Sequence, residues 1–199
     1  MAATPDAADD CGSHPELPDW ARPLVEELTL RDGAAVTLRP IRPQDLPRHT
    51  RFVHALSPHT GYMRLLSPRM PQPDELQRMT ETDYPHALAL VAIACVDGVQ
   101  TEVGVARYAP SVDARAAARK SAEFAIVLAD AWQGRGLARV LLSRLVEAAR
   151  AAGVRELADV TLHENAPMIG LARAMGFTVT RDPHDARLTQ LRKALDTDA

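Results

Sequence analysis

The alternation of apolar and polar residues divides the chain into short strands, several of which come in pairs. Two Asp-Gly dipeptides, Asp32-Gly33 and Asp97-Gly98, each lie between two runs of residues with strand-like patterns. Asp-Gly favours the two-residue turn of a β-hairpin, so each pair of runs predicts two antiparallel strands. The first hairpin is expected at an edge of the sheet. The strands of the two hairpins and the strand that follows them are expected at 26–31, 34–39, 87–96, 102–108 and 122–128.

Helical spacing of apolar residues is clearest in 137–152, where Leu137, Leu141 and Leu145 recur and Gly153 supplies a stop. Shorter helices are expected over 44–56, with Pro47 in the first turn, around 62–66 between prolines, and from Asn165 to Met175. Strands at 157–162, 177–180 and 187–191 alternate with these last helices, and the polar loop 111–120 is expected to be exposed. This order predicts an α/β fold: a mixed sheet with helices on both faces.

Composition limits the size and the partners of this fold. With 199 residues, 46% of them hydrophobic, the chain supports one domain, expected at 24–199. Residues 1–23 have no apolar period and are expected to form a flexible extension. The 23 basic and 26 acidic residues argue against nucleic acid as a partner, and the longest apolar run, 87–96, is too short to span a membrane.

The cysteines and histidines predict neither a disulfide nor a metal site. Cys11 lies in the polar extension and Cys95 in an apolar strand, which makes a structural disulfide improbable and favours a reducing, cytoplasmic compartment. The seven histidines are scattered, and none forms the His-x-x-x-His pair of a helical metal site. We therefore expect no metal.

The most informative segment, Gln133-Gly134-Arg135-Gly136-Leu137-Ala138, leaves a strand and opens the longest predicted helix. Backbone N–H groups at a helix start lack intrahelical partners, so such a turn is suited to phosphate oxygens, and Arg135 and Arg139 add positive charge. The nucleoside-triphosphate loop and the dinucleotide fingerprint both fail to match, since no Gly-Lys-Ser/Thr occurs and Arg139 replaces the third glycine. A plain helix N-terminus remains the alternative.

At this turn the sequence resembles the GNAT superfamily of N-acetyltransferases, whose signature is Gln/Arg-x-x-Gly-x-Gly/Ala. The match extends to Asn165 and to Met175-Gly176-Phe177, which are spaced as in the second conserved segment of the family. Segments 37–45, 56–58 with Tyr62, and 122–127 further resemble the catalytic domain of bacterial Pat-type protein lysine acetyltransferases. The likeness covers about residues 30–180.

The resemblance implies acetyl-CoA as cosubstrate and a GNAT-type sheet, mostly antiparallel, splayed where acyl-CoA enters. The amides of 133–138 would hold the pyrophosphate, residues 126–128 would pair with the pantetheine arm, and the amide of Ile126 would stabilise the oxyanion. The implied cofactor-binding residues are Ile126, Val127, Leu128, Gln133, Gly134, Arg135, Gly136, Leu137, Ala138, Arg139 and Asn165. For Asn165, a helix N-cap is an equally good interpretation.

An amine acceptor with a pKa of about 10.4 must lose a proton before it attacks a thioester. Glu123 lies on the same predicted strand as Ile126 and matches the general-base glutamate of Pat-like enzymes; the alternative is a solvated strand carboxylate. Many GNAT enzymes place a tyrosine where this chain has Ala172, so the group that protonates the leaving thiolate is unassigned.

The acceptor itself is left open by the residues. Tyr62, Arg64, Asp83 and Tyr84 lie in segments that cover the acceptor side in the family, although loop packing is the favoured explanation for them. We expect transfer to a protein lysine, with a small amine as first alternative and a noncatalytic acyl-CoA-binding sensor as second. Both a monomer and a homodimer are compatible with the sequence.

Overall fold

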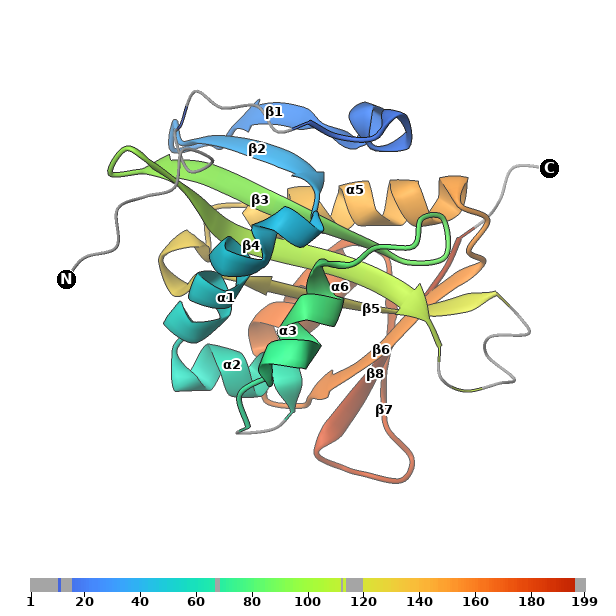
Figure 1. The fold of residues 1–199 in the computed structure, drawn as a ribbon. Helices are drawn as coiled ribbons and strands as arrows, with labels where there is room; N and C mark the ends of the chain where they lie inside the picture. Colours follow the sequence, from blue (N-terminus) through green and yellow to red (C-terminus); the bar gives the residue numbers. More distant parts are fainter. Residues whose placement is uncertain (1–10, 12–15, 67–68, 112, 114–119, 196–199) are drawn as a thin grey trace.

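The computed structural model describes Cys11 and residues 16–66, 69–111, 113 and 120–195. A single eight-stranded sheet has the order β1-β2-β3-β4-β5-β6-β8-β7, and of these pairs only β5–β6 is parallel (Figure 1). The predicted mixed, mostly antiparallel sheet is therefore confirmed. The strands are β1 Glu26–Thr29, β2 Ala35–Pro40, β3 Leu88–Val96, β4 Val99–Pro110, β5 Ser121–Leu128, β6 Glu156–Leu162, β7 Thr178–Arg181 and β8 Leu188–Ala194.

Helices cover both faces of this sheet (Figure 1). On one face α5 and α6 share a core with β2 to β6, and on the other α1 and α3 pack on β3 and β4. Helix α2 contacts the two strands β5 and β6. The helices are α1 Leu46–Ala55, α2 Pro58–Leu65, α3 Pro73–Thr80, α5 Leu137–Ala151 and α6 Ala166–Ala174, with 3-10 turns η2 Asp19–Leu24, η3 Pro43–Asp45 and η4 Asp130–Trp132.

Both predicted hairpins are confirmed, and β1 is an edge strand as expected. The short helix expected near 62–66 instead begins at Pro58, because the Ser57 side chain caps it by accepting a hydrogen bond from the Thr60 N–H at 3.2 Å. Helix α3 was not predicted. It is only eight residues long and begins at Pro73 in a proline-rich segment, although Leu76, Met79 and Thr80 recur at helical spacing. Most of the loop expected at 111–120 lies outside the described residues.

The parallel pairing of β5 with β6 is short, and this opens the sheet. It joins Ser121 to Glu156 and ends at Glu123 opposite Ala158, although β5 continues to Leu128 and β6 to Leu162. Beyond Glu123, β5 is paired only with β4 on its other side. The predicted splay is therefore present, and it exposes backbone N–H and C=O groups of β5 that no neighbouring strand uses.

One expectation about the N-terminal residues is wrong. Cys11 and Cys95 form a disulfide, with their Cα atoms 5.7 Å apart. Their separation of 84 residues hides this proximity in the sequence, and the disulfide removes one ground for expecting a reducing compartment. The extension expected over 1–23 also includes part of η2, in which Ala21 is fully buried and Trp20 stacks on Tyr84 with ring centroids 5.0 Å apart.

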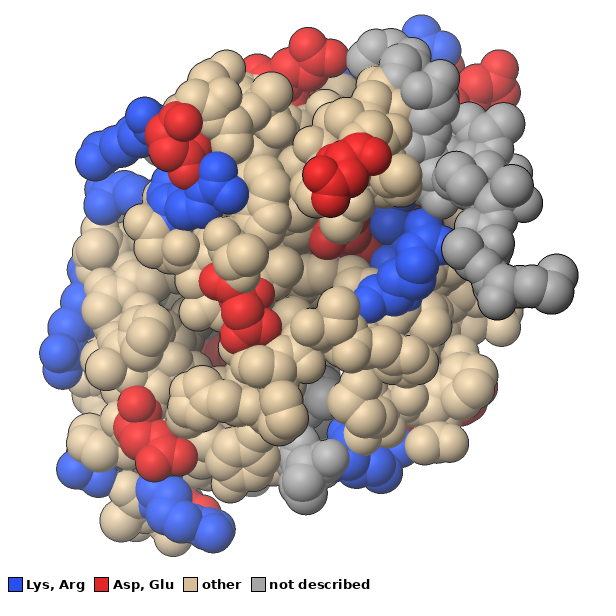
Figure 2. All heavy atoms as spheres, turned by 90° about the vertical axis from the view of Figure 1, so that its left-hand side faces the viewer, with Lys and Arg blue, Asp and Glu red and all other residues tan. Residues whose placement is uncertain are grey.

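The described surface agrees with the charge balance of the sequence. On the face shown in Figure 2, basic and acidic side chains are interspersed, and no broad area of one sign covers it. No helix within the described residues combines the length and the apolar character needed to cross a membrane.

Candidate active site

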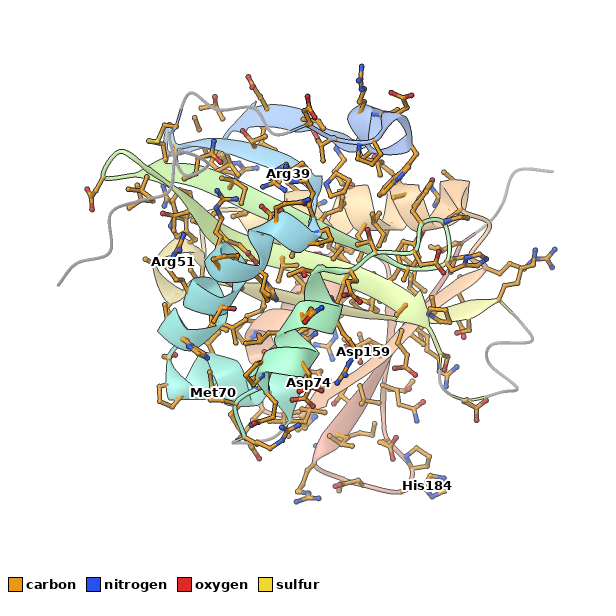
Figure 3. The ribbon with its side chains drawn as sticks, in the orientation of Figure 1. Arg39, Arg51, Met70, Asp74, Asp159 and His184 are labelled. Atoms are coloured by element: carbon orange, nitrogen blue, oxygen red, sulfur yellow. A yellow bond between two sulfur atoms is a disulfide. The ribbon has the colours of Figure 1, made fainter. Side chains whose placement is uncertain are left out.

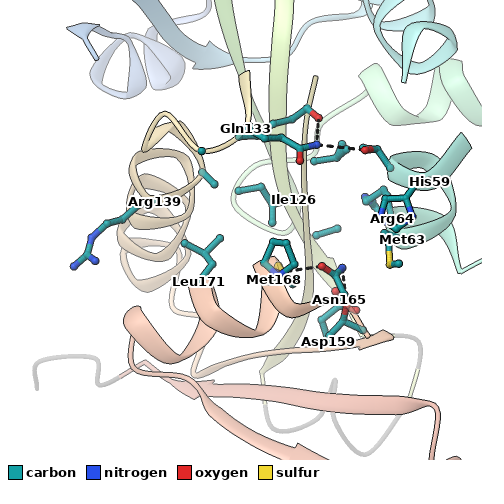
Figure 4. A pocket seen from close by; sticks show the side chains of 18 of the residues that line it. His59, Met63, Arg64, Ile126, Gln133, Arg139, Asp159, Asn165, Met168 and Leu171 are labelled. Carbon is teal, nitrogen blue, oxygen red and sulfur yellow. Dashed lines mark hydrogen bonds between the residues drawn. The ribbon is translucent and has the colours of Figure 1, made fainter. Parts of the chain in front are cut away.

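A cavity of about 420 Å³ lies where β5 and β6 separate (Figure 4). Its walls come from α2 and from the starts of α5 and α6, and the four successive β5 residues 125–128 line it, so the cavity lies within the splay. The residues that line it are His59, Thr60, Met63, Arg64, Ala125, Ile126, Val127, Leu128, Gln133, Gly134, Gly136, Ala138, Arg139, Asp159, Val160, Thr161, Glu164, Asn165, Pro167, Met168 and Leu171.

One wall is the unpaired edge of β5. Residues 125–128 line the cavity, and they lie beyond Glu123, where pairing with β6 stops. Because successive residues of a strand present their backbone groups to opposite sides, alternate residues here offer N–H and C=O groups to the cavity. An extended chain that carries amide groups can therefore add to this edge as a further strand.

A second wall is the glycine turn that opens α5. Gly134 and Gly136 have φ angles of 72° and 88°, in the left-handed region, and a side chain at either position would be strained. No atom lies within 4 Å of where a Cβ would stand on either glycine. The turn thus leaves open space in front of the free N–H groups of α5, where the helix dipole favours an anion.

The Gln133 side chain is engaged within the protein. Its Nε2 donates to the Thr60 hydroxyl at 3.3 Å and to the Leu128 carbonyl at 3.4 Å. The Thr60 hydroxyl in turn donates to Asp130 at 2.6 Å, and Ser57 donates to the same carboxylate through its N–H at 3.0 Å and its hydroxyl at 2.7 Å. This network ties the start of α2 to the turn before α5.

Two residues predicted at this turn do not line the cavity. Arg135 forms an ion pair with Asp32 on the β1–β2 turn, and its guanidinium lies 4.1 Å from the centroid of the Trp132 ring. Leu137 is fully buried in the core beneath the sheet. The other predicted cofactor-binding residues, including Arg139, all line the cavity.

Helix α6 closes the cavity with mainly apolar side chains, among them Met168 and Leu171. Asn165 is its N-cap, since the side-chain oxygen accepts from the Met168 N–H at 3.2 Å, while Nδ2 donates to the Thr161 hydroxyl at 3.1 Å. Asn165 also lines the cavity, so a cap and a ligand contact are compatible. Ala172 is fully buried.

Charged side chains gather at the side of the cavity opposite Arg139, where Arg64 of α2 and Asp159 of β6 lie (Figure 4). Burial raises the pKa of Asp159 to about 7, against the lowering effects of the Val160 N–H and the Arg64 charge, and the negative charge of Glu123 raises it further. Burial also lowers the pKa of Arg64, which Asp159 partly offsets. Such opposed shifts in a cavity are typical of functional sites.

Glu123 lies beside this cavity rather than in its wall. Its side chain is exposed and accepts a hydrogen bond from the Ser111 hydroxyl at 3.0 Å. It stands at the last paired position of β5, close enough to Asp159 for the two charges to interact. Glu123 is thus at the mouth of the splay, within reach of solvent.

Of the four predicted acceptor-side residues, only Arg64 lines the cavity. Tyr62 lies on the same helix with 40% of its surface exposed, whereas Tyr84 stacks on Trp20. Asp83 is an exposed carboxylate with His86 Nδ1 3.5 Å away. Loop packing, the alternative interpretation, therefore fits Asp83 and Tyr84.

Sequence reasoning missed several lining residues, above all Asp159 and His59. Asp159 stands in the middle of an expected strand, where an acidic residue would normally face solvent, and no local pattern shows that the strand beside it has turned away. His59 lies in the first turn of α2, which begins at Pro58 and not near residue 62 as the sequence predicts, so a position in the cavity wall was not expected for it. Among the described residues, no group of three His, Cys, Asp or Glu side chains is placed to hold a metal ion.

Comparison with known protein families gives one consistent result. A model of the acetyltransferase (GNAT) family matches residues 59–177, which include the cavity walls from α2 to α6. An acetyltransferase from Pseudomonas aeruginosa is 36% identical over 168 residues, covering 84% of this chain and 88% of that protein.

Two further relatives differ in how much they share. The GNAT domain of PAT from S. lividans superposes with a TM-score of 0.74 at 27% identity, covering 90% of this chain and 100% of that domain. An L-methionine sulfoximine/L-methionine sulfone acetyltransferase from Salmonella typhimurium is 40% identical over 62 residues, which is 31% of this chain and 36% of that protein.

Proposed function

Since the chain belongs to the GNAT family and is an acetyl-CoA-dependent N-acetyltransferase, we propose that the cavity at the β5–β6 splay holds acetyl-CoA. We further propose that the acceptor is a protein lysine side chain, with Glu123 as general base. The observation that carries the first proposal is the continuity of the cavity from the glycine turn along the free β5 edge.

Each part of acetyl-CoA has a matching surface. The free N–H groups from Gly134 to Ala138 suit the pyrophosphate, whereas the exposed Arg139 side chain points away from the cavity in Figure 4. The pantetheine amides suit the unpaired backbone groups of β5 from Ile126 to Leu128. Arg135, which pairs with Asp32, is left out of this set.

The chemistry follows from the same placement. The amine attacks the thioester carbonyl, and a β5 N–H, which we assign to Ile126, stabilises the resulting oxyanion. Glu123 accepts a proton from the ammonium form of the acceptor and passes it to solvent, which its exposed position at the mouth allows. Asn165 contacts the cosubstrate from the α6 side.

A protein acceptor is favoured by the mouth of the cavity and by the likeness to the PAT domain. Tyr62 and Val160, which are 40% and 37% exposed, present apolar surface beside the charged end. Such surface suits the stem and flanking residues of a lysine-bearing segment.

A small amino-acid-like amine is the second candidate. The segment shared with the methionine sulfoximine/sulfone acetyltransferase favours it, and so does Arg64, whose fixed cation in the cavity wall suits an acceptor carboxylate. A lysine side chain within a protein brings no such carboxylate.

Thiol release from acetyl-CoA, measured with lysine-bearing proteins, free lysine and other amino acids, tests the function and separates the two acceptors. We expect release with the proteins, and a preference for free amino acids would favour the second candidate. Tight acetyl-CoA binding without release for any amine would contradict both and favour a sensor.

Glu123→Gln is expected to lower kcat at saturating acceptor by roughly 10²- to 10⁴-fold, because the acceptor nitrogen then keeps its proton. The matched control is Glu27→Gln, an exposed strand glutamate on β1, which should leave kcat unchanged. Unchanged turnover in Glu123→Gln would rule out Glu123 as the base.

A further inference from the structure

We propose that Asp159 is a second catalytic carboxylate, which takes the proton that the attacking nitrogen loses after the C–N bond forms and returns it to the leaving sulfur. The positive charge of Arg64 tunes the proton affinity of this carboxylate. This inference rests on the proposed acetyl transfer and concerns how the protons of that reaction move.

The need for a second group follows from counting protons. An ammonium acceptor loses two protons on its way to an amide, while the departing CoA sulfur gains one and solvent gains the other. In this chain Ala172 stands at the position where many GNAT enzymes carry a tyrosine, and it is fully buried without a proton to give. Ala172 therefore cannot protonate the sulfur, which leaves another residue of the cavity or solvent as the proton source.

Asp159 has the position that this role needs. It directly follows Ala158, the last residue of β6 paired with β5, and its side chain lines the cavity with Val160 and Thr161. On its other side β6 is paired with β8, where Leu191 stands opposite Asp159 and is fully buried. Asp159 itself lines the cavity (Figure 4).

Charged groups on the surrounding elements set the proton affinity of Asp159. Arg64 and His59 of α2 line the same cavity, as does Glu164 before α6, while Glu123 approaches from β5. On β8, Arg192 lies next to the residue opposite Asp159, and its guanidinium is paired with Glu156. Burial and the charge of Glu123 together outweigh Arg64, so the pKa of Asp159 is raised to about 7.

The proton affinity of Asp159 allows it both to accept a proton from the acceptor nitrogen and to donate it to the CoA thiolate. An ordinary aspartic acid has a pKa of about 3.9 and a thiol about 8.5, so a carboxyl group near 7 binds a proton better than usual and still gives it up to a thiolate. Glu123, exposed and hydrogen-bonded to Ser111, suits exchange with solvent instead. The two carboxylates thus divide the two protons between solvent and sulfur.

Glu123 takes one proton from the ammonium group, and the neutral nitrogen forms the C–N bond as the carbonyl π electrons move to oxygen. Ionised Asp159 takes a proton from the now cationic nitrogen. When the oxyanion re-forms the carbonyl, the C–S bond breaks with its electrons on sulfur, and protonated Asp159 gives its proton to the thiolate.

The experiment measures kcat against pH with saturating acetyl-CoA and acceptor. Because Asp159 begins the cycle ionised, we expect wild-type kcat to rise with pH through an inflection near 7. Asp159→Asn should lower kcat roughly 10²- to 10³-fold and abolish the inflection, with KM for acetyl-CoA changed by less than about threefold. Asp159→Glu should restore part of kcat together with an inflection, which a purely structural role would not produce.

Arg64→Gln supplies a second readout. Without the positive charge of Arg64, the inflection should move to higher pH, and Arg64→Lys should bring it back toward the wild-type position. The matched control is Asp74→Asn on α3, an exposed aspartate paired with Arg78 at 2.9 Å, which should change neither kcat nor the profile.

The outcomes separate this inference from the proposed function. Absence of thiol release by the wild-type protein with every amine overturns the proposed function itself. An active wild-type protein together with an Asp159→Asn variant that keeps the inflection, or at least half of kcat, overturns only the role of Asp159. An inflection that is unmoved in Arg64→Gln overturns the role of Arg64.

Discussion

Asp45 and Asp159 both feel the charge of an arginine, but their pKa values shift in opposite directions. Asp45 follows β2, from which Arg39 projects, whereas Asp159 lies on the splayed strand β6 (Figure 3). Asp45 is 1% exposed, yet its pKa is lowered, because hydrogen bonds and the charge of Arg39 overcome the effect of burial. For Asp159 burial prevails, and the pKa rises to about 7.

The difference comes from how many partners each carboxylate has. Asp45 accepts from Arg39 Nη1 at 2.6 Å and Nη2 at 2.8 Å, from Arg48 Nη1 at 2.8 Å and from the Arg42 N–H at 2.9 Å. Its charge is thus neutralised inside the fold. Asp159 is left with a weaker set and faces a cavity. A closed ion cluster maintains structure, whereas an incompletely paired carboxylate in a cavity has proton affinity to spare for chemistry.

The largest effect is expected for Asp45→Asn. Removing this charge leaves the buried Arg39 and Arg48 without their anion, so the free energy of unfolding should fall by about 3–5 kcal/mol. Urea unfolding at pH 7 measures it, with the exposed Asp74→Asn variant as control. A loss as small as that of the control would show that the ion cluster around Asp45 does not stabilise the fold.

The same substitution at Asp159 should have the opposite sign. Because its pKa is raised from 3.8 to about 7, ionising Asp159 destabilises the fold as pH rises between those values. Asp159→Asn removes this cost, so at pH 8 the variant should be more stable than the wild type by about 1–2 kcal/mol, allowing for solvent screening, and equal to it near pH 4. Urea unfolding at both pH values checks the sign, and a destabilised variant at pH 8 would contradict it.

The smallest effect is expected for a third aspartate, Asp130, whose partners are uncharged. Asp130 is paired with hydroxyl and N–H donors of Ser57 and Thr60, which lower its pKa against the effect of burial. Asp130→Asn should loosen α2 from the glycine turn and raise KM for acetyl-CoA a few-fold, with thermal stability nearly unchanged. Steady-state kinetics measure this, and an unchanged KM would show that the network does not position the cavity wall.

The parts of the fold that sequence predicted are those with strong local signals. Asp32-Gly33 and Asp97-Gly98 determine their own turns, and the apolar period of 137–152 determines α5. Helix α3 has only two turns of apolar spacing, in a segment broken by prolines, which is a weak local signal. The Cys11–Cys95 disulfide joins residues 84 positions apart, so no local pattern shows it.

The candidate site divides in the same way. Gly134, Gly136 and Gln133 were predictable because a strand-to-helix turn is a local motif, and all three line the cavity. Arg135 belongs to the same motif but pairs with Asp32, a residue from another hairpin that no spacing rule connects to it. Glu123 was found by resemblance, whereas Asp159 required knowing where β6 leaves β5.

The sequence by itself determined that this chain forms a mixed sheet with an anion-binding turn and belongs among acetyltransferases, because turns, helix starts and motif spacing are written in neighbouring residues. Only the tertiary structure decided which charges are neutralised and which face a cavity. Desolvation and ion pairing depend on residues brought together from distant strands and helices, as Arg64, Glu123 and Asp159 are. The proton affinity of an aspartate is therefore a property of the fold rather than of its position along the chain.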